Sequence, residues 1–378
     1  MRVLIVYHYF AHYRLPLFKE LSSIDDVSFL YVGGKECDTR IELIDFDKTN
    51  LEFKPVQNYW FFKKKFLYQR GLLKVLFHEE YDTVIFLGSI FHISTWLGVF
   101  FSRFIKNKKT IFWMHGTWKR NISLIDVIKI FVFYKLPKHL FLYGHWAEKR
   151  LADFGLKNST VIYNSLNYAE SLGLRSITDK YSQISFRQQN FENTLPTVVF
   201  VGRVNYAKRI DLLVKLQIEA YLNPNSQMFN LMIIGAGEEL ELLKKYVEEN
   251  GLSKYTKFKG AVYDEEKISM IIKYSDICIT PGRMGLTAIH SLSYGTPICT
   301  NSNFETQMPE VESLIEGLTG FVFEESNIND LGKKMNNWFK LYPFKTEELQ
   351  ARCFKIIDER FNPKVQAEII KKTLSELS

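Results

Sequence analysis

Residues 200–213 read FVGRVNYAKRIDLL, and this segment indicates how the chain is built. The apolar residues before Gly202 are typical of a buried strand, Gly202 allows a tight backbone turn, and a helical pattern follows. Arg203, Lys208 and Arg209 lie between the strand and the helix. A strand end, a helix start and fixed cations together favour an anion site suited to a diphosphate. A solvated basic loop is the alternative.

Two further segments repeat this strand–turn–helix pattern. IIGAGE at 233–238 is a short glycine turn, which alone is a weak signal. TPGRMGLTAIHSL at 280–292 closes a strand with Pro and Gly, and backbone N–H groups near Thr287 are placed to receive a phosphate. His290 falls about one turn into the predicted helix, where either a site residue or a structural histidine fits the pattern.

Strand-length apolar runs alternate with helical patterns along the whole chain, which predicts α/β architecture with parallel sheets. The predicted strands of a first series are Arg2–Tyr7, Val27–Val32, Thr83–Leu87, Thr110–Trp113, His139–Tyr143 and Ser159–Tyr163, and those of a second are Thr197–Val201, Leu231–Ile234, Thr256–Lys259, Ile277–Thr280 and Pro297–Thr300. The polar segment 170–196 lacks clear periodicity and is interpreted as a linker. Two doubly wound, Rossmann-like domains facing a cleft are expected, with ligands at the carboxyl ends of the strands.

Composition excludes several classes of protein. The 378 residues are 46% hydrophobic and 24% charged, which is globular composition and excludes wholesale disorder. The four cysteines lie far apart without a CxxC pair, so a disulfide scaffold and a cysteine zinc site are not expected, and a reducing compartment fits. No signal peptide is expected from Met1–Tyr9, which is interpreted as a buried strand.

The positive charge is concentrated in the first half of the chain. The net charge is +7, but residues 1–168 hold 24 Lys and Arg against 15 Asp and Glu, and residues 54–157 hold 18 against 6. This asymmetry points to an anionic partner such as a phospholipid surface or a phosphate-bearing substrate. Nucleic acid is disfavoured because no recognition motif is present.

Residues 83–102 contain no charged side chain and approach the length of a membrane-spanning helix. The segment also contains Gly88, Ser89 and His92, so we predict a strand, a Gly-Ser turn and an amphipathic helix to about Phe104 instead.

Taken in order and spacing, these segments resemble the retaining GT-B glycosyltransferases of the glycosyl transferase group 1 superfamily (family 4). The best matches are FVGRVNYAKRIDLL (200–213), IIGAGEELELLK (233–244), FKGAV (258–262), YSDICITPG (274–282) and GLTAIHSLSYGTPI (285–298), with weaker ones at VIYNSLN (161–167) and IEGLTGFVF (315–323). The resemblance covers nearly the whole chain. It implies an N-terminal acceptor domain (1–169), a C-terminal nucleotide-sugar domain (197–350) and a segment (351–378) whose last helix crosses back to the N-terminal domain.

The resemblance also implies which residues bind the donor. Arg203 and Lys208 match the basic pair that holds the donor diphosphate, where preorganised cations offset the charge of the leaving nucleotide without a metal. The expected donor-binding residues are Gly202, Arg203, Lys208, Val262, Arg283, Met284, Gly285, Leu286, Thr287 and His290. The donor is a UDP- or GDP-linked sugar that serves as substrate, and no cofactor or metal is expected.

The sequence departs from the family at two positions. The family has two glutamates eight positions apart around the phosphate turn, and here Gly282 and His290 stand there. His290 can still hydrogen-bond a ribose, whereas Gly282 has no side chain to offer. This departure leaves the donor sugar open.

Three residues of the N-terminal half are expected to act on the acceptor side. His12 and Arg14 follow the first strand, where the family often has a glycine-rich loop, and are expected to bind a sugar or phosphate of the acceptor. His115 matches a family histidine beside the reacting sugar carbon and, with Arg203 and Lys208, is the expected catalytic residue; a buried structural histidine is the alternative.

The resemblance therefore implies a retaining glycosyltransferase acting on a lipid-linked or polysaccharide acceptor in the biosynthesis of bacterial capsule, O-antigen or exopolysaccharide. Two alternatives remain: a nucleotide-sugar epimerase on the same fold, and a non-catalytic relative that binds nucleotide sugar or lipid.

A cytoplasmic protein attached to the inner face of the membrane is also expected. Trp60, Phe61 and Phe62 precede Lys63, Lys64 and Lys65, and this combination suits an anionic membrane interface. Core aromatics beside solvated lysines are the alternative.

Overall fold

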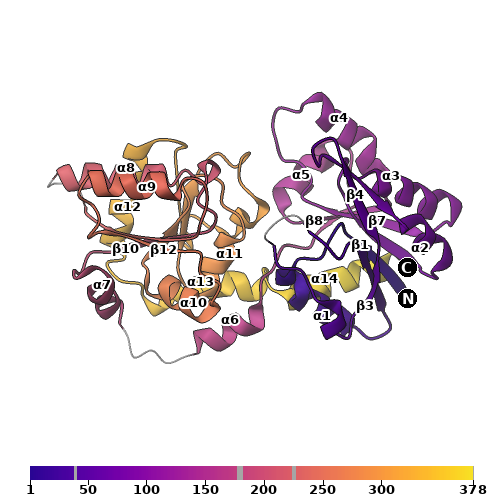
Figure 1. Cartoon of the computed structure of the whole chain (residues 1–378), viewed down its shortest axis with the longest axis horizontal. Coiled ribbons are helices and arrows are strands. Elements are labelled where there is room, and N and C mark those ends of the chain that lie inside the picture. Colours follow the sequence, from indigo (N-terminus) through magenta and orange to yellow (C-terminus); the bar gives the residue numbers. More distant parts are fainter. Residues whose placement is uncertain (38–40, 177–181, 224–226, 378) are drawn as a thin grey trace. The chain divides into compact units, whose positions relative to one another are not determined.

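The computed structural model describes residues 1–37, 41–176, 182–223 and 227–377 (Figure 1). The chain forms two compact units: unit 1 is Met1–Asn167 with Asn362–Ser378, and unit 2 is Tyr168–Phe361. Each unit is built around its own parallel sheet. The expected α/β class with two Rossmann-like sheets is therefore confirmed.

Unit 1 contains a seven-stranded parallel sheet in the order β3-β2-β1-β6-β7-β8-β9. Its strands are β1 (Arg2–Val6), β2 (Ser28–Gly33), β3 (Glu52–Pro55), β6 (Thr83–Leu87), β7 (Lys109–Met114), β8 (His139–Leu142) and β9 (Ser159–Val161). The central strands are buried apolar runs because helices cover both faces of the sheet. These helices are α1 (Leu15–Ser22), α2 (Leu72–His78), α3 (Ile93–Phe100), α4 (Leu124–Phe131), α5 (His145–Asp153) and α14 (Pro363–Glu376).

Unit 1 also contains an antiparallel hairpin of β4 (Gln57–Phe61) and β5 (Phe66–Arg70). Sequence periodicity did not indicate this hairpin or β3, since neither shows a clean alternation of apolar and polar residues. The hairpin lies beside the segment that leads into α3, because the Leu67 N–H donates to the Phe91 carbonyl at 3.0 Å.

The uncharged stretch 83–102 divides as predicted. It contains β6, a turn and α3, which continues as a π-helical turn at Phe101–Ile105. Within the described ranges, no helix combines the length and the apolar character that crossing a bilayer requires.

Unit 2 contains a six-stranded parallel sheet in the order β12-β11-β10-β13-β14-β15. Its strands are β10 (Thr197–Val201), β11 (Asn230–Ile234), β12 (Thr256–Gly260), β13 (Ile277–Ile279), β14 (Ile298–Asn301) and β15 (Gly320–Phe323). Its helices are α6 (Tyr168–Arg175), α7 (Gln183–Phe191), α8 (Asp211–Leu222), α9 (Leu240–Glu249), α10 (Glu265–Tyr274), α11 (Thr287–Ser293), α12 (Ile328–Leu341) and α13 (Glu347–Glu359).

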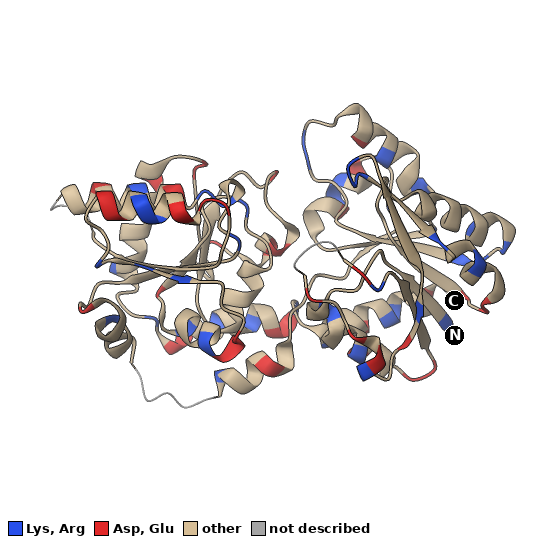
Figure 2. Ribbon diagram, viewed as in Figure 1, with Lys and Arg blue, Asp and Glu red and all other residues tan. Residues whose placement is uncertain are grey.

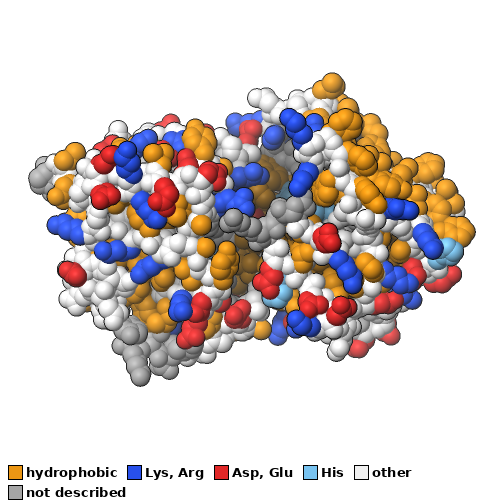
Figure 3. All heavy atoms as spheres, in the orientation of Figure 1, with side chains coloured by type: hydrophobic (Ala, Val, Ile, Leu, Met, Phe, Trp, Pro, Cys, Tyr) orange, Lys and Arg blue, Asp and Glu red, His pale blue; other side chains and the backbone are white. Residues whose placement is uncertain are grey.

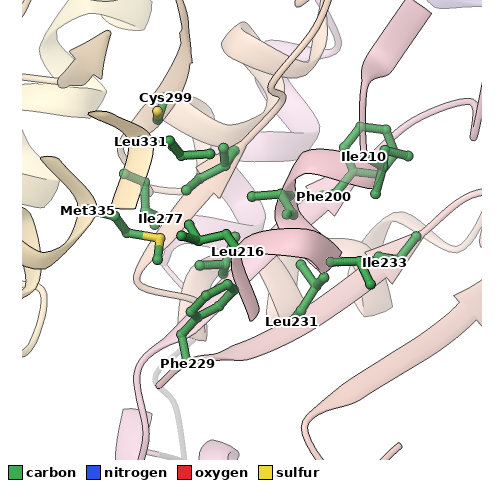
Figure 4. Close-up of a cluster of buried hydrophobic side chains, with 14 of the residues drawn as sticks. Phe200, Ile210, Leu216, Phe229, Leu231, Ile233, Ile277, Cys299, Leu331 and Met335 are labelled. Carbon is green, nitrogen blue, oxygen red and sulfur yellow. The ribbon is translucent and has the colours of Figure 1, made fainter. Parts of the chain in front are cut away.

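The core of unit 2 lies between this sheet and its helices. Figure 4 shows Phe200 of β10 and Leu231 of β11 near Leu216 of α8, and Cys299 of β14 near Leu331 of α12. All five side chains are buried. The strand ends that carry the glycine turns are thereby fixed to a rigid apolar layer.

Two expected boundaries differ in the structure. The segment 170–196 is not an unstructured linker, since α6 and α7 occupy most of it and both belong to unit 2; its residues 177–181 lie outside the described residues. The segment that returns to unit 1 begins at Asn362 and not at 351, because α13 belongs to unit 2. Pro363 is the first residue of α14, and the Asn362 side chain caps the helix.

The helix α14 packs within unit 1, as the resemblance implies. Ala367, Ile370 and Leu374 lie in one core cluster with residues of β1 and α1, and Figure 1 shows α14 (yellow) beside α1. The Gln366 side chain donates to the Tyr163 carbonyl at 2.9 Å. Unit 1 is therefore completed by a segment that follows unit 2 in the sequence.

Candidate functional site

The three glycine-containing segments of unit 2 meet at one edge of its sheet. Because β10, β11 and β13 are parallel, the loops that follow them emerge side by side. The Gly202 N–H donates to the Ile234 carbonyl at 2.9 Å, and the Gly282 N–H donates to the Lys208 carbonyl at 2.8 Å. The loop 202–209 is thus bonded to both neighbouring loops.

Close backbone contact explains two of the glycines. A Cβ atom at Gly235 would lie 1.8 Å from the Gly202 carbonyl oxygen, and one at Gly282 would lie 2.2 Å from the Ala207 carbonyl oxygen. Neither position has space for a side chain unless the loop 202–209 moves. Close backbone packing therefore explains why Gly282 stands where the family has a glutamate.

The cations of these loops have different surroundings. The Lys208 ammonium donates to the Arg283 carbonyl at 2.6 Å, and burial together with the nearby Arg283 charge lowers its pKa below the ordinary lysine value. Arg203 and Arg283 are exposed. Arg209 turns away and pairs with Asp211 at 3.1 Å. Lys208, Arg203 and Arg283 are therefore the cations that remain for an anionic ligand.

The turn before α11 offers backbone donors. The N–H groups of Gly285, Leu286 and Thr287 donate no hydrogen bond to any described residue. The Thr287 hydroxyl donates to the Val201 carbonyl at 3.0 Å, which ties the turn to the end of β10. Met284 was also expected to bind the donor. Its side chain is fully buried, and its N–H donates to the Gln307 side chain at 2.7 Å.

His290 is bound to a carboxylate that the sequence analysis did not select. Its Nε2 donates to Glu265 Oε1 at 2.7 Å, and the Tyr294 hydroxyl donates to the same oxygen at 2.5 Å. Burial alone would raise the pKa of Glu265, but the hydrogen bonds from His290 and Tyr294 outweigh it and hold this pKa below its ordinary value. Val262 packs against the apolar cluster that contains Tyr294.

Glu265 can be identified as a candidate site residue only from its hydrogen bond with His290 in the structure. It lies 25 residues before His290 in the sequence, on another helix. In the segment DEEK it is indistinguishable from an ordinary acidic first turn of a helix.

Unit 1 contains a cavity of about 470 Å³ at the ends of β1, β6 and β7. Its lining includes Arg14 and His115, two of the three predicted acceptor-side residues, together with His8, His92 and Tyr143. His115 is exposed, and its ring lies 4.8 Å from the Tyr143 ring. His12 is exposed and does not line this cavity.

The expected membrane residues fall into two groups. Trp60 faces inward, with its ring 6.2 Å from that of His8 and 6.0 Å from that of His92. Phe61, Phe62 and the three lysines are exposed at the tip of the β4–β5 hairpin.

A second exposed apolar surface lies on the helices beside this hairpin. We call it the apolar face, and its exposed side chains are Leu73, Phe77, Ile93, Leu97, Phe100, Phe104, Ile105, Leu124, Ile125, Ile128, Phe131 and Val132. Figure 3 shows hydrophobic side chains gathered over α2, α3 and α4. A contiguous apolar surface of this kind is unusual for a protein surface that only contacts water.

No metal site is visible in the described part of the chain. Nowhere within it do three or more His, Cys, Asp or Glu side chains gather closely enough to hold an ion. Within the described residues, Cys278, Cys299 and Cys353 are buried free thiols.

Residues 182–356 match the family described as glycosyl transferases group 1. The glycogen synthase of Francisella tularensis subsp. tularensis is 30% identical over 165 residues, which are 40% of this chain and 32% of that protein. The match thus spans about a third of the length of this curated relative. It supports the family of the second unit and leaves the activity of the whole chain to be proposed.

Solved structures of similar fold cover the whole chain. Anabaena Alr3699/HepE in complex with UDP has a TM-score of 0.72 at 15% identity, with 100% of both chains covered. The lipopolysaccharide outer core galactosyltransferase WaaB, in its apo form, has a TM-score of 0.69 at 12% identity, again with 100% of both chains covered. Residues 182–356 therefore belong to the glycosyl transferases group 1 family, in a chain that has the GT-B fold.

Proposed function

We propose that this protein is a retaining glycosyltransferase that uses a nucleotide-sugar donor. The observation that carries the proposal is the anion site of unit 2, where Lys208 and Arg283 lie beside the unused N–H groups of residues 285–287. A nucleoside diphosphate has the charge and the acceptor oxygens that such a group of donors satisfies. The similar fold of Alr3699/HepE, solved with UDP, supports this choice of ligand.

The same groups favour departure of the nucleotide. Breaking the bond between sugar and diphosphate builds negative charge on the diphosphate, and fixed cations stabilise that charge without reorganisation. Arg203 and Lys208 are the proposed source of this stabilisation, with His115 of unit 1 as the proposed group near the reacting sugar carbon. Glu265 and His290 are proposed to bind the ribose, since a carboxylate can accept hydrogen bonds from both ribose hydroxyl groups.

The acceptor is proposed to bind unit 1 and to be a lipid-linked or polysaccharide glycan, in the biosynthesis of a bacterial surface polysaccharide. Arg14 and His115 line a cavity in which aromatic rings can contact a sugar. The basic character of residues 54–157 suits an acceptor that carries phosphate.

Attachment to the inner face of the cytoplasmic membrane forms part of the proposal. The apolar face and the hairpin tip provide exposed apolar surface that becomes buried when it inserts into a membrane. Lys63, Lys64 and Lys65 at the tip attract anionic lipids. Acidic and basic residues alternate instead along α8 and α9 of unit 2 (Figure 2). Free cysteines are compatible with the reducing cytoplasm.

The donor site is tested by calorimetric titration with UDP, GDP and their sugars.

Lys208→Ala should reduce turnover by about 100-fold or more, the usual loss when one charge-stabilising group is removed. Lys215→Ala, on the solvent side of α8, is the matched control and should behave like the wild type. Turnover of Lys208→Ala within a few-fold of the wild type would contradict the diphosphate role.

A non-catalytic binding role is the second candidate, because backbone packing at Gly282 leaves the site without the first family glutamate. The two candidates differ in one measurement. Tight UDP binding without transfer to any acceptor glycan would favour the binding role, whereas release of UDP that depends on an acceptor would exclude it.

Membrane attachment is tested with anionic vesicles. Replacing Lys63, Lys64 and Lys65 by Ser should weaken sedimentation with the vesicles and remove most of its salt dependence, since each lysine contributes about 1 kcal/mol near an anionic surface. Replacing the exposed Lys244 and Lys245 of α9 by Ser should change neither. Equal sedimentation of the hairpin variant and the wild type would dispose of this part of the proposal.

A further inference from the structure

The cavity of unit 1 contains a cation without a carboxylate partner. Among the described residues, its lining includes Arg14 and Lys129 but neither Asp nor Glu. Lys129 is paired with Asp126 at 2.9 Å, whereas Arg14 forms no ion pair with any described residue. Burial lowers the pKa of His8 to about 4 and that of His92 to about 3, so both histidines are neutral at neutral pH. Arg14 therefore supplies the unbalanced positive charge of this cavity.

Aromatic rings hold the guanidinium in place. Its central carbon lies 5.5 Å from the ring centres of Tyr7, Tyr13 and Tyr143 and 5.4 Å from that of Trp113. Such contacts stabilise a cation without neutralising it. The group is fixed in position but keeps its full charge.

The remaining hydrogen-bonding capacity of the guanidinium points to a ligand. Nη2 donates to the Tyr143 hydroxyl and Nε to the Tyr13 hydroxyl at 3.3 Å, while Nη1 is buried and has no acceptor. Tyr7 is 4% exposed, and its hydroxyl interacts with that of Tyr143, so Nη1 is the group of this cluster that lacks a partner among the described residues. Proteins rarely leave a buried charged group unsatisfied, because desolvation without a partner is costly.

A phosphate group fits this unsatisfied nitrogen. Nη1 is the guanidinium nitrogen with no acceptor among the described residues, and both of its N–H groups can donate to a bound anion. A tetrahedral phosphate presents several acceptor oxygens, and the N–H groups of Nη1 can donate to them. A volume of about 470 Å³ falls within the range of small-molecule sites, and the aromatic walls add apolar surface for a sugar ring.

We propose that this cavity binds the phosphate of a sugar phosphate through Arg14, so that the acceptor of the reaction is recognised by a phosphate ester next to its sugar. The inference rests on the proposed glycosyltransferase function and specifies its acceptor. The phosphate comes either from a soluble sugar phosphate or from the head group of a sugar-linked lipid phosphate.

Calorimetry with glucose 1-phosphate tests the site in the full chain. Saturating UDP is present throughout, so that the donor site of unit 2 is occupied. We expect glucose 1-phosphate to bind and neutral glucose to bind at least tenfold more weakly. Arg14→Gln should lower the affinity for glucose 1-phosphate by at least tenfold. Arg14→Lys, which keeps the charge, should restore part of the affinity.

Arg103→Gln is the matched control for loss of an arginine in unit 1. Arg103 donates to the carbonyls of Lys135 and Pro137 and does not line the cavity, so this variant should bind glucose 1-phosphate like the wild type. A far-ultraviolet circular dichroism spectrum equal to that of the wild type excludes misfolding of either variant.

A second arm separates the two sources of phosphate. Phosphatidylcholine vesicles that contain polyprenyl-phosphoglucose should bind the wild type more than Arg14→Gln if the lipid head group is the ligand. Equal affinities of wild type and Arg14→Gln for both the soluble ester and these vesicles would overturn the inference. The UDP titration separates this failure from failure of the proposed function, because loss of UDP binding concerns unit 2 alone.

Discussion

Glu265 shows how one carboxylate takes its role from its neighbours. Two donors, His290 and Tyr294, meet at the same oxygen and keep the group ionised although it is largely buried. Both of these bonds are to Oε1, and Oε2 accepts no hydrogen bond from any described residue.

The first prediction follows from this pair. Glu265→Gln and His290→Ala should each weaken the binding of UDP by about 1–2 kcal/mol, the scale of one lost hydrogen bond. Because the two residues act together, the double variant should lose much less than the sum of the two single losses. Calorimetry of the four proteins measures this coupling. Fully additive losses, or unchanged affinity in His290→Ala, would assign His290 to the core.

At the scale of elements, α7 shows why segment 170–196 was interpreted as a linker although it belongs to unit 2. This helix has little apolar periodicity, and polar contacts anchor it instead. Arg187 on α7 pairs with Asp276 at 2.6 Å with both side chains nearly inaccessible, and the Asp276 carboxylate also accepts from the Thr197 N–H at 2.6 Å. A buried ion pair between residues 89 positions apart leaves no local pattern in the sequence.

Lys345 lies just before α13 in the same region. Its ammonium donates to the Thr296 hydroxyl at 2.6 Å and to the Lys273 carbonyl. Burial is the main reason that its pKa is lowered to about 7. Between pH 7 and about 10.4, the ordinary lysine value, the unfolded chain therefore binds more protons than the folded one, and stability rises with pH.

The second prediction concerns this pH dependence. In Lys345→Met, the free energy of unfolding should lack the rise between pH 7 and pH 10, which is on the order of a few kcal/mol in the wild type. Urea unfolding at both pH values gives the difference between the two proteins. Parallel pH profiles would mean that Lys345 is not held at a lowered pKa.

At the scale of the whole molecule, the sequence predicted the arrangement of strands better than the contents of the sites. The turns at Gly202 and Gly285 lie between a strand and the following helix, as the sequence predicts, because turn residues and buried apolar runs are local signals. The roles of Glu265, of Arg14 among its aromatic rings and of the apolar face depend on contacts between distant segments. Trp60 was assigned to the membrane because neighbouring aromatics suggested exposure, but strand alternation turns it inward.

The third prediction uses the division into two units. Ile370 of α14 is fully buried in unit 1, so Ile370→Ala should destabilise that unit by about 2–5 kcal/mol. Tryptophan fluorescence follows unit 1, which contains all the tryptophans except Trp338. Leu331→Ala, in the core of unit 2, should leave this transition almost unchanged. Equal shifts in both variants would mean that the units unfold together.

The place of α14 in unit 1 also has a consequence during protein synthesis. The ribosome makes residues 1–167 first, yet the surface that Ala367, Ile370 and Leu374 cover stays bare until all of unit 2 has been translated. Unit 2 has its entire sequence available earlier, although it stands second in the chain. The nascent first unit therefore presents apolar surface for the time needed to translate about two hundred residues, at about 5–20 residues per second. A chaperone that binds apolar segments should associate with ribosomes stalled before Asn362 and dissociate once α14 has emerged.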